Sequence, residues 1–271
     1  MNFHSDEWIM GKVQEHYNEA LEYFPEDRIV GIFYQGSGNY GLDYEGSDVD
    51  TKLIVTPTFE DIAMNRKAVS TTHVRENDEH IDFKDIRLYM ETFRKQNLNF
   101  LEILFTPYKI INPMYKKEWE RLIDGREFIA HMNEYRAVKS MKGIALEKFH
   151  AMEHKYPSKV DVLAQWGYDP KQLHHLIRVK NYLQRYIAGD AYENCLVLDD
   201  ATRGYLLGIK RGVYDLETAR DLAKQSIDNV VKIADDFCAE REDHELSWIH
   251  CLLEDVQYNI MKIAIEKEFN K

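Results

Sequence analysis

Two short polar segments of the sequence carry residue types suited to binding phosphates and metal ions. The first is Gly36-Ser37, which follows an apolar run rich in β-forming residues. The second is residues 46–50, with the sequence Gly-Ser-Asp-Val-Asp, which opens the next such run. Glycine lets a backbone approach a phosphate, and serine can donate hydrogen bonds from its hydroxyl and its amide. If a helix begins at about Ser37, its positive N-terminal end adds to the predicted anion site.

Asp48 and Asp50 are two residues apart on a predicted strand, so their side chains project together while apolar Val49 turns to the other face. Two ionised carboxylates so close repel each other and need a compensating cation. Mg²⁺ takes hard oxygen ligands, keeps several waters and is completed by substrate phosphates. The pair therefore predicts a magnesium site.

A third carboxylate, Asp82, stands between apolar residues on another predicted strand, where a charged side chain needs a partner. With Asp48 and Asp50 it would complete a site for two Mg²⁺ ions, or for Mn²⁺ as a substitute. One ion would hold a triphosphate, and the other would lower the pKa of an attacking hydroxyl. Nearby Asp85 is interpreted as the cap of the following helix.

The elements that must position these residues follow from hydrophobic periodicity. Short runs of β-forming residues predict strands at 28–34, 49–55, 70–75 and 80–83, with a hairpin turn at 76–79. Helical spacing predicts a first helix that is capped by Ser5 and runs to about Phe24, and a short helix at 58–67. After residue 83 it predicts helices at about 115–124, 131–154, 170–187, 200–209, 215–241 and 244–268. The chain therefore divides into a mixed α/β first half and a helical second half.

Composition and charge restrict the class of protein. Hydrophobic residues make up 44% of the 271 and charged residues 30%, an ordinary globular composition. No apolar run reaches membrane-spanning length, the N-terminus lacks a signal-peptide pattern, and the three cysteines form no close pair, so we expect a cytoplasmic protein without a membrane span. The net charge of −12 argues against a uniformly basic nucleic-acid surface. Residues 131–211 nevertheless carry 13 Lys+Arg against 9 Asp+Glu and could face an anionic ligand.

The string from Gly36 to Asp50, Gly-Ser-x-x-Tyr-Gly followed by Gly-Ser-Asp-x-Asp, resembles the DNA polymerase beta-like nucleotidyltransferase superfamily. It looks most like the predicted nucleotidyltransferases of bacteria and phages, some of which are linked to RNA repair. Softer similarity in residues 95–107, 171–178 and 205–212 extends the resemblance over about residues 28–240. Lys52 departs from the purely apolar strand of many members, and we expect it either to touch substrate or to be exposed.

The resemblance implies an α+β fold and a reaction. Residues 1–125 would form a nucleotidyltransferase core, a small mixed β-sheet with flanking helices. Residues 126–271 would form an all-helical domain that binds substrate or closes over it. The reaction would be Mg²⁺-dependent transfer of a nucleoside monophosphate from a nucleoside triphosphate to an acceptor hydroxyl, with release of pyrophosphate. The expected acceptor is an RNA end, and the implied catalytic residues are Asp48, Asp50 and Asp82.

The nucleotide would bind Gly36 and Ser37 and, from the helical domain, Lys171, His175 and Arg178. These last three residues share one face of a predicted helix and could hold a triphosphate or an RNA phosphate. The alternative is an ordinary solvated basic face.

Two other interpretations remain open. The same chemistry could nucleotidylate a protein or a small molecule, as in toxin–antitoxin or antibiotic-modifying relatives, and an acidic surface suits such acceptors better. The chain could also be a catalytically silent nucleotide-binding module, although its intact acidic residues argue against this. The sequence sets neither the preferred base nor the oligomeric state.

Overall fold

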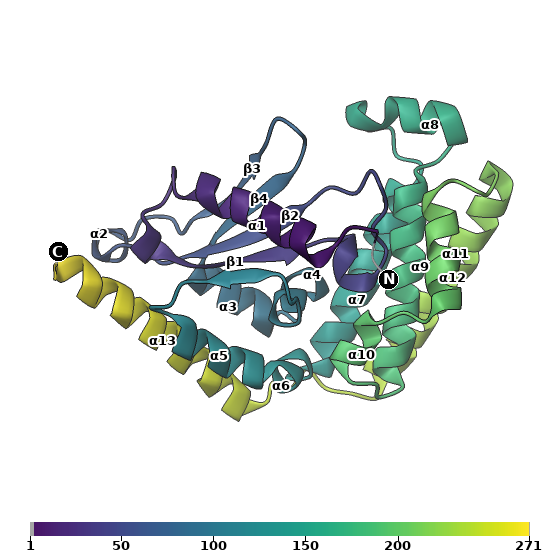
Figure 1. Cartoon of the computed structure of the whole chain (residues 1–271). Helices are drawn as coiled ribbons and strands as arrows, with labels where there is room; N and C mark the ends of the chain where they lie inside the picture. The colour runs from purple at the N-terminus through teal and green to yellow at the C-terminus, as the bar shows by residue number, and fades with distance from the viewer. Residues whose placement is uncertain (1–2, 271) are drawn as a thin grey trace. The chain divides into compact units, whose positions relative to one another are not determined.

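The computed structural model describes residues 3–270, which contain a five-stranded mixed sheet and many helices (Figure 1). The strands are β1 (Ile29–Gln35), β2 (Asp50–Val55), β3 (Ser70–Val74), β4 (His80–Asp85) and β5 (Lys109–Ile111). Their order is β3-β4-β2-β1-β5; β2 and β4 run parallel, and the other neighbours are antiparallel. The predicted α+β class is confirmed, and β5 is a strand that the sequence analysis did not predict.

Two helices, one before β1 and one after β4, have the N-caps that the sequence predicts. The Ser5 side chain accepts a hydrogen bond from the Trp8 amide at the start of α1, and Asp85 accepts one from the Arg87 amide at the start of α3. The α-helices are α1 (Asp6–Ala20), α2 (Phe59–Ala63), α3 (Ile86–Arg94), α4 (Leu98–Leu101), α5 (Lys116–Asp124), α6 (Arg126–Ala130), α7 (Glu134–Ala151), α8 (Val160–Trp166), α9 (Pro170–Ile187), α10 (Tyr192–Leu196), α11 (Asp200–Lys210), α12 (Leu216–Ala239) and α13 (Ser247–Phe269). Single 3₁₀ turns occur at Glu26–Arg28, Ser37–Tyr40, Glu102–Leu104 and Pro157–Lys159.

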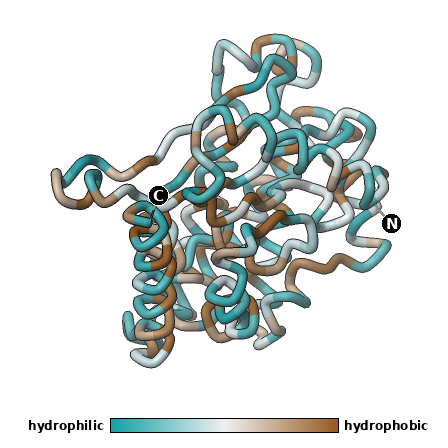
Figure 2. The backbone as a smooth tube through the Cα atoms, turned by 60° about the vertical axis from the view of Figure 1, so that its left-hand side comes forward, coloured by the Kyte–Doolittle hydropathy of each residue, from teal (hydrophilic) through white to brown (hydrophobic). Residues whose placement is uncertain are grey.

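The chain forms two compact units whose boundaries differ from the predicted 1–125 and 126–271. The first unit runs up to Met132 and resumes at Glu245, and the second is Asn133–His244. The difference arises because α13 packs against α5 and α3 of the first unit. Apolar residues recur along α13 (Figure 2), and its buried positions include Ile249, Leu253 and Val256. Periodicity shows that such a helix has a buried face, but not which part of the chain covers it.

Helices cover both faces of the sheet in the first unit. Figure 1 shows α1, in purple, lying along β1 and β2. Its residues Ile9 and Val13 belong to one buried cluster with strand residues that include Val49 and Leu53. The opposite face carries the alternate strand residues: Phe33 contacts Trp119 of α5, and α3 packs on β2 and β4.

The second unit is helical, as the sequence predicted for this part of the chain. Helix α9 packs against α7, α11 and α12, and α12 also packs against α7. The interior includes Leu173, Leu176 and Leu183 of α9 and Val230 of α12. Over residues 3–270, the structure contains no helix that is both long enough and apolar enough to cross a membrane.

Candidate functional site

The antiparallel pairing of β1 with β2 brings the two polar segments together. Gln35, the last residue of β1, pairs with Asp50, the first residue of β2. Gly36 and Ser37 therefore leave the sheet at the point where residues 48–50 enter it. The Ser37 hydroxyl lies 3.3 Å from the Ser47 hydroxyl and donates a hydrogen bond to it. The structure thus places both segments at the same end of the sheet.

Gly36 packs directly against the side chain of Tyr34. A Cβ atom on Gly36 would lie 2.6 Å from the Tyr34 hydroxyl oxygen, and the Tyr34 ring is only 2% exposed. The same hydroxyl accepts a hydrogen bond from the Gly38 amide at 3.0 Å. Burial raises the pKa of Tyr34, so this hydroxyl stays protonated at neutral pH. The local packing therefore requires glycine at position 36.

The condition set in the sequence analysis, an α-helix that begins at about Ser37, is not met. Residues Ser37–Tyr40 form a single 3₁₀ turn, which ends at Gly41 with a φ of 69°. One turn aligns too few peptide dipoles to act as a helix N-terminus. The loop that follows is held by Asp43, a buried carboxylate that accepts hydrogen bonds from the backbone amides of Phe3 (3.1 Å) and His4 (2.8 Å).

Asp48 and Asp50 flank the buried Val49 at the start of β2. Asp48 is exposed, and the Asp50 side chain is 43% exposed. Asp50 Oδ1 accepts hydrogen bonds from the His80 amide at 3.0 Å and from His80 Nδ1 at 3.1 Å, in the tautomer that carries its hydrogen on Nδ1. The sequence analysis did not single out His80. Its signal is its place on β4 two residues before Asp82, which puts both side chains on one face.

Asp82 lies beside Lys52 in the parallel register of β2 and β4. Asp82 Oδ2 is 3.1 Å from Lys52 Nζ, and Asp82 Oδ1 accepts a hydrogen bond from the Thr72 hydroxyl at 3.1 Å. Of the two alternatives expected for Lys52, exposure is wrong, because the residue is buried and its Nζ lies 4.2 Å from the centre of the Phe100 ring; contact with substrate stays a prediction. Burial lowers the pKa of Lys52, and the charge of Asp82 opposes that shift.

The residues at this end of the sheet fit one cation better than two. Asp48 and Asp50 offer the hard oxygen donors that Mg²⁺ prefers. Both oxygens of Asp82 have side-chain partners, Lys52 on one oxygen and Thr72 on the other. Within residues 3–270, no three His, Cys, Asp or Glu side chains are arranged so that they could hold a metal ion together. The two-ion site on Asp48, Asp50 and Asp82 stays a prediction from the sequence.

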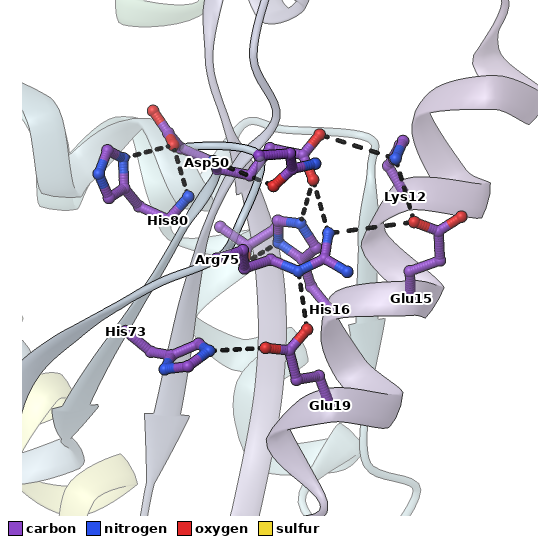
Figure 3. Close-up of polar contacts among 11 residues, drawn as sticks. Lys12, Glu15, His16, Glu19, Asp50, His73, Arg75 and His80 are labelled. Carbon is purple, nitrogen blue, oxygen red and sulfur yellow. Dashed lines mark hydrogen bonds and ion pairs between the residues drawn. The ribbon is translucent and has the colours of Figure 1, made fainter.

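A buried polar network ties α1 to the β3–β4 hairpin (Figure 3). His16 is fully buried; its Nδ1 accepts a hydrogen bond from the Thr51 hydroxyl at 2.9 Å, and its Nε2 donates one to Glu79 at 3.1 Å. Arg75 bridges Glu79 and Glu19 at 2.6 and 2.7 Å. Figure 3 shows these groups next to the contact between Asp50 and His80. In the chain, Thr51 directly follows Asp50 and Glu79 directly precedes His80.

The network sets the charge of its own members. Burial lowers the pKa of His16, and this outweighs the hydrogen bond to Glu79, so His16 is neutral in the folded protein. Burial alone would raise the pKa of Glu79, but hydrogen bonds with Asn77 and His16 and the charge of Lys12 lower it. A neutral imidazole thus donates to an ionised carboxylate in the interior.

The predicted basic residues Lys171, His175 and Arg178 all lie on α9 of the second unit. Burial, reinforced by the charge of Arg178, lowers the pKa of His175 well below its usual value, so the imidazole is neutral beside these cations. Their role in binding a nucleotide stays a prediction. His174 is a structural residue: its Nδ1 donates to the Leu206 carbonyl at 2.9 Å, and burial lowers its pKa to about 3.

No protein-family model matches the chain, and no curated protein sequence matches it. Among solved structures, the chain is similar to a nucleotidyltransferase-like protein from Exiguobacterium sibiricum 255-15. The two share 11% sequence identity over 84% of this chain and 75% of that chain, with a TM-score of 0.31. At this level of similarity, the residues of the site itself must carry any assignment of function.

The contact between Gly36 and Tyr34 predicts the effect of the Gly36→Ala variant. The added methyl group would displace the buried Tyr34 ring, so we expect the free energy of unfolding to fall by about 1–3 kcal/mol in urea denaturation. Gly46→Ala is the matched control, because a Cβ there would make only ordinary contact with Tyr44, 3.4 Å from its ring. Equal losses of stability in the two variants would contradict this account of Gly36.

The buried neutral state of His16 predicts a pH dependence of stability. The unfolded chain protonates this residue near pH 6.5, whereas the folded protein protonates it only at lower pH. The free energy of unfolding should therefore decline as the pH falls below 6.5, by at most about 1.4 kcal/mol per pH unit for one group.

Urea denaturation at pH 7.5 and 5.5 of the wild type and His16→Gln isolates this contribution, because His174 and His175 titrate alike in both proteins. The wild type should lose more stability over this interval than the variant. Parallel pH profiles would show that His16 is protonated in the folded state as readily as in the unfolded one.

Proposed function

We propose that this protein is a nucleotidyltransferase that moves a nucleoside monophosphate from a nucleoside triphosphate to an acceptor hydroxyl and releases pyrophosphate. The pairing of Gln35 with Asp50 carries the proposal, because it sets the Gly36-Ser37 turn beside Asp48 and Asp50. A turn of this kind offers hydrogen-bond donors to a triphosphate. The carboxylates beside it offer ligands to the cation that accompanies a triphosphate.

Each residue of this group has a distinct role in the proposal. Asp48 and Asp50 hold Mg²⁺, which when bound neutralises triphosphate charge and polarises the α-phosphate. His80 orients Asp50 through two hydrogen bonds to one carboxylate oxygen. The Ser37 hydroxyl now donates to Ser47 and turns its hydrogen toward a phosphate oxygen when the nucleotide binds.

The reaction exchanges one bond at phosphorus for another. The acceptor oxygen forms a bond to the α-phosphorus, and the bond from that phosphorus to the oxygen bridging to the β-phosphate breaks. Pyrophosphate leaves with the electron pair, and the acceptor proton passes to solvent. Such a reaction depends mainly on positioning and on stabilising charge. An Asp50 held at the edge of a sheet by His80 supplies the rigidity that this requires.

For the acceptor, we propose an RNA end. The support is the excess of positive charge over residues 131–211, most of which belong to the helical second unit. Lys171 and Arg178 on α9 are the members proposed to contact phosphates of the nucleotide or acceptor. The overall charge of −12 favours a protein or a small molecule as the alternative acceptor.

The direct test incubates the protein and Mg²⁺ with each α-³²P-labelled nucleoside triphosphate, together with total RNA or with total cell protein. We expect label on RNA, reduced about 100-fold or more in Asp48→Asn and Asp50→Asn because each variant removes an oxygen ligand that stabilises charge. Glu45→Gln is the matched control, since Glu45 is an exposed acidic residue of the same loop. Circular dichroism confirms that each variant is folded.

The outcomes separate the competing functions. Label on protein alone would replace RNA by a protein acceptor. Nucleotide binding without labelled RNA or protein, in the wild type as in the variants, would favour a small-molecule acceptor or a silent binding module. Transfer near the wild-type rate in Asp50→Asn would reject the site.

The α9 residues predict a change in KM rather than in kcat. Lys171→Ala and Arg178→Ala each remove a cation proposed to bind phosphate, so the KM for nucleotide or RNA should rise about tenfold, equivalent to about 1.4 kcal/mol. Lys224→Ala is the control, because Lys224 is an exposed residue of the same unit paired with Asp228. Steady-state kinetics with an unchanged KM would make this helix face an ordinary solvated one.

A further inference from the structure

Lys52 is a buried cation among the carboxylates of the proposed site. Its side chain is only 6% exposed. It follows Asp50 by two residues on β2, so the two side chains share one face of the sheet, and Asp82 is its neighbour on β4. An ammonium ion in this place changes the charge that the carboxylates present to a metal.

Lys52 and Asp82 make further side-chain contacts beside their own ion pair, and the Asp82 side chain is 26% exposed. The Phe100 ring lies against Lys52, and Lys84 Nζ lies 4.3 Å from the centre of the same ring. The Thr72 hydroxyl occupies the other oxygen of Asp82. A buried ammonium ion needs its partner, because an unpaired charge in the interior is strongly unfavourable. Asp82 is therefore committed to Lys52 rather than available to a metal ion.

Formal charge agrees with this arrangement. Three aspartates at −1 each and Lys52 at +1 leave −2 for Asp48, Asp50, Asp82 and Lys52 together. One divalent cation neutralises that charge before any triphosphate binds, and Lys84 adds further positive charge nearby. A second divalent cation held by Asp82 would have to approach the Lys52 ammonium, which lies 3.1 Å from Asp82 Oδ2.

We propose that Lys52 takes the place of a second metal ion: its ammonium group holds Asp82, and the site binds one divalent cation through Asp48 and Asp50. The inference rests on the proposed function, since it concerns the ion that accompanies the nucleotide. It assigns Lys52 a charge-balancing and positioning role. It also assigns Asp82 to Lys52 instead of to a metal, unlike the sequence-based expectation.

Equilibrium dialysis of Mn²⁺ against the full chain saturated with α,β-methylene-ATP counts the bound ions without any reaction. The wild type should bind one Mn²⁺ per chain in the complex with the nucleotide analogue. Asp50→Asn should weaken this binding by about tenfold or more, whereas Asp82→Asn should still bind one ion per chain. Lys52→Met frees the Asp82 carboxylate and should admit a second ion. Lys84→Met is the matched control, because it removes the other cation at the Phe100 ring and should still bind one ion.

Two results would overturn the inference. One is a wild type that binds two ions and loses one in Asp82→Asn; transfer activity would then still support the proposed function, with two ions. The other is a folded Lys52→Met variant that binds one ion like the wild type. If the wild type binds the analogue but no Mn²⁺, the metal site fails, and the transfer assay decides separately whether the proposed function fails with it.

Discussion

The register between β1 and β2 is the constraint on which the candidate site depends. Pairing Gln35 with Asp50 makes the end of one strand and the start of the next coincide, so the Gly36-Ser37 turn and two carboxylates lie at one end of the sheet. A slip of one residue would turn Asp50 into the core and Val49 out of it, and would bury a charge at the cost of an apolar contact. Burial of Val49 and Leu53 in the core cluster therefore stabilises the sheet and also fixes the strand register that places Asp48 and Asp50.

The network around His16 supports the same end of the sheet from the side of α1. His16 and Arg75 connect α1 and the hairpin to residues that adjoin Asp50 and His80 in the chain. Apart from the Arg75–Glu79 pair, which lies within the hairpin turn, these contacts join different elements, so a shift of the hairpin would leave buried polar atoms without partners. Polar contacts in the interior thus specify where β4 lies relative to β2, which the apolar packing alone defines less sharply.

Local sequence patterns predicted four of the five strands, the two caps at Ser5 and Asp85, and the Gly-Ser and Asp-x-Asp segments, because each depends on residues close in the chain. They did not predict the pairing of Lys52 with Asp82. That pairing depends on the parallel register of β2 and β4, which are joined through β3 and a helix, and spacing within either strand carries no information about it. For the same reason, the sequence did not predict that α13 belongs to the first unit, since the amphipathic pattern of a helix does not show which elements pack on its apolar face.

The return of α13 makes the second unit an insertion within the first. The Leu246 amide donates a hydrogen bond to the Met132 carbonyl at 3.0 Å, so the chain leaves the first unit and re-enters it at neighbouring points. During synthesis, the sheet and its polar end emerge long before the helix that completes their surroundings. The surfaces of α3 and α5 that α13 covers therefore stay uncovered until the whole second unit has been synthesised. An early stop anywhere in the inserted unit would therefore leave all five strands in place but α3 and α5 without the helix that packs on them.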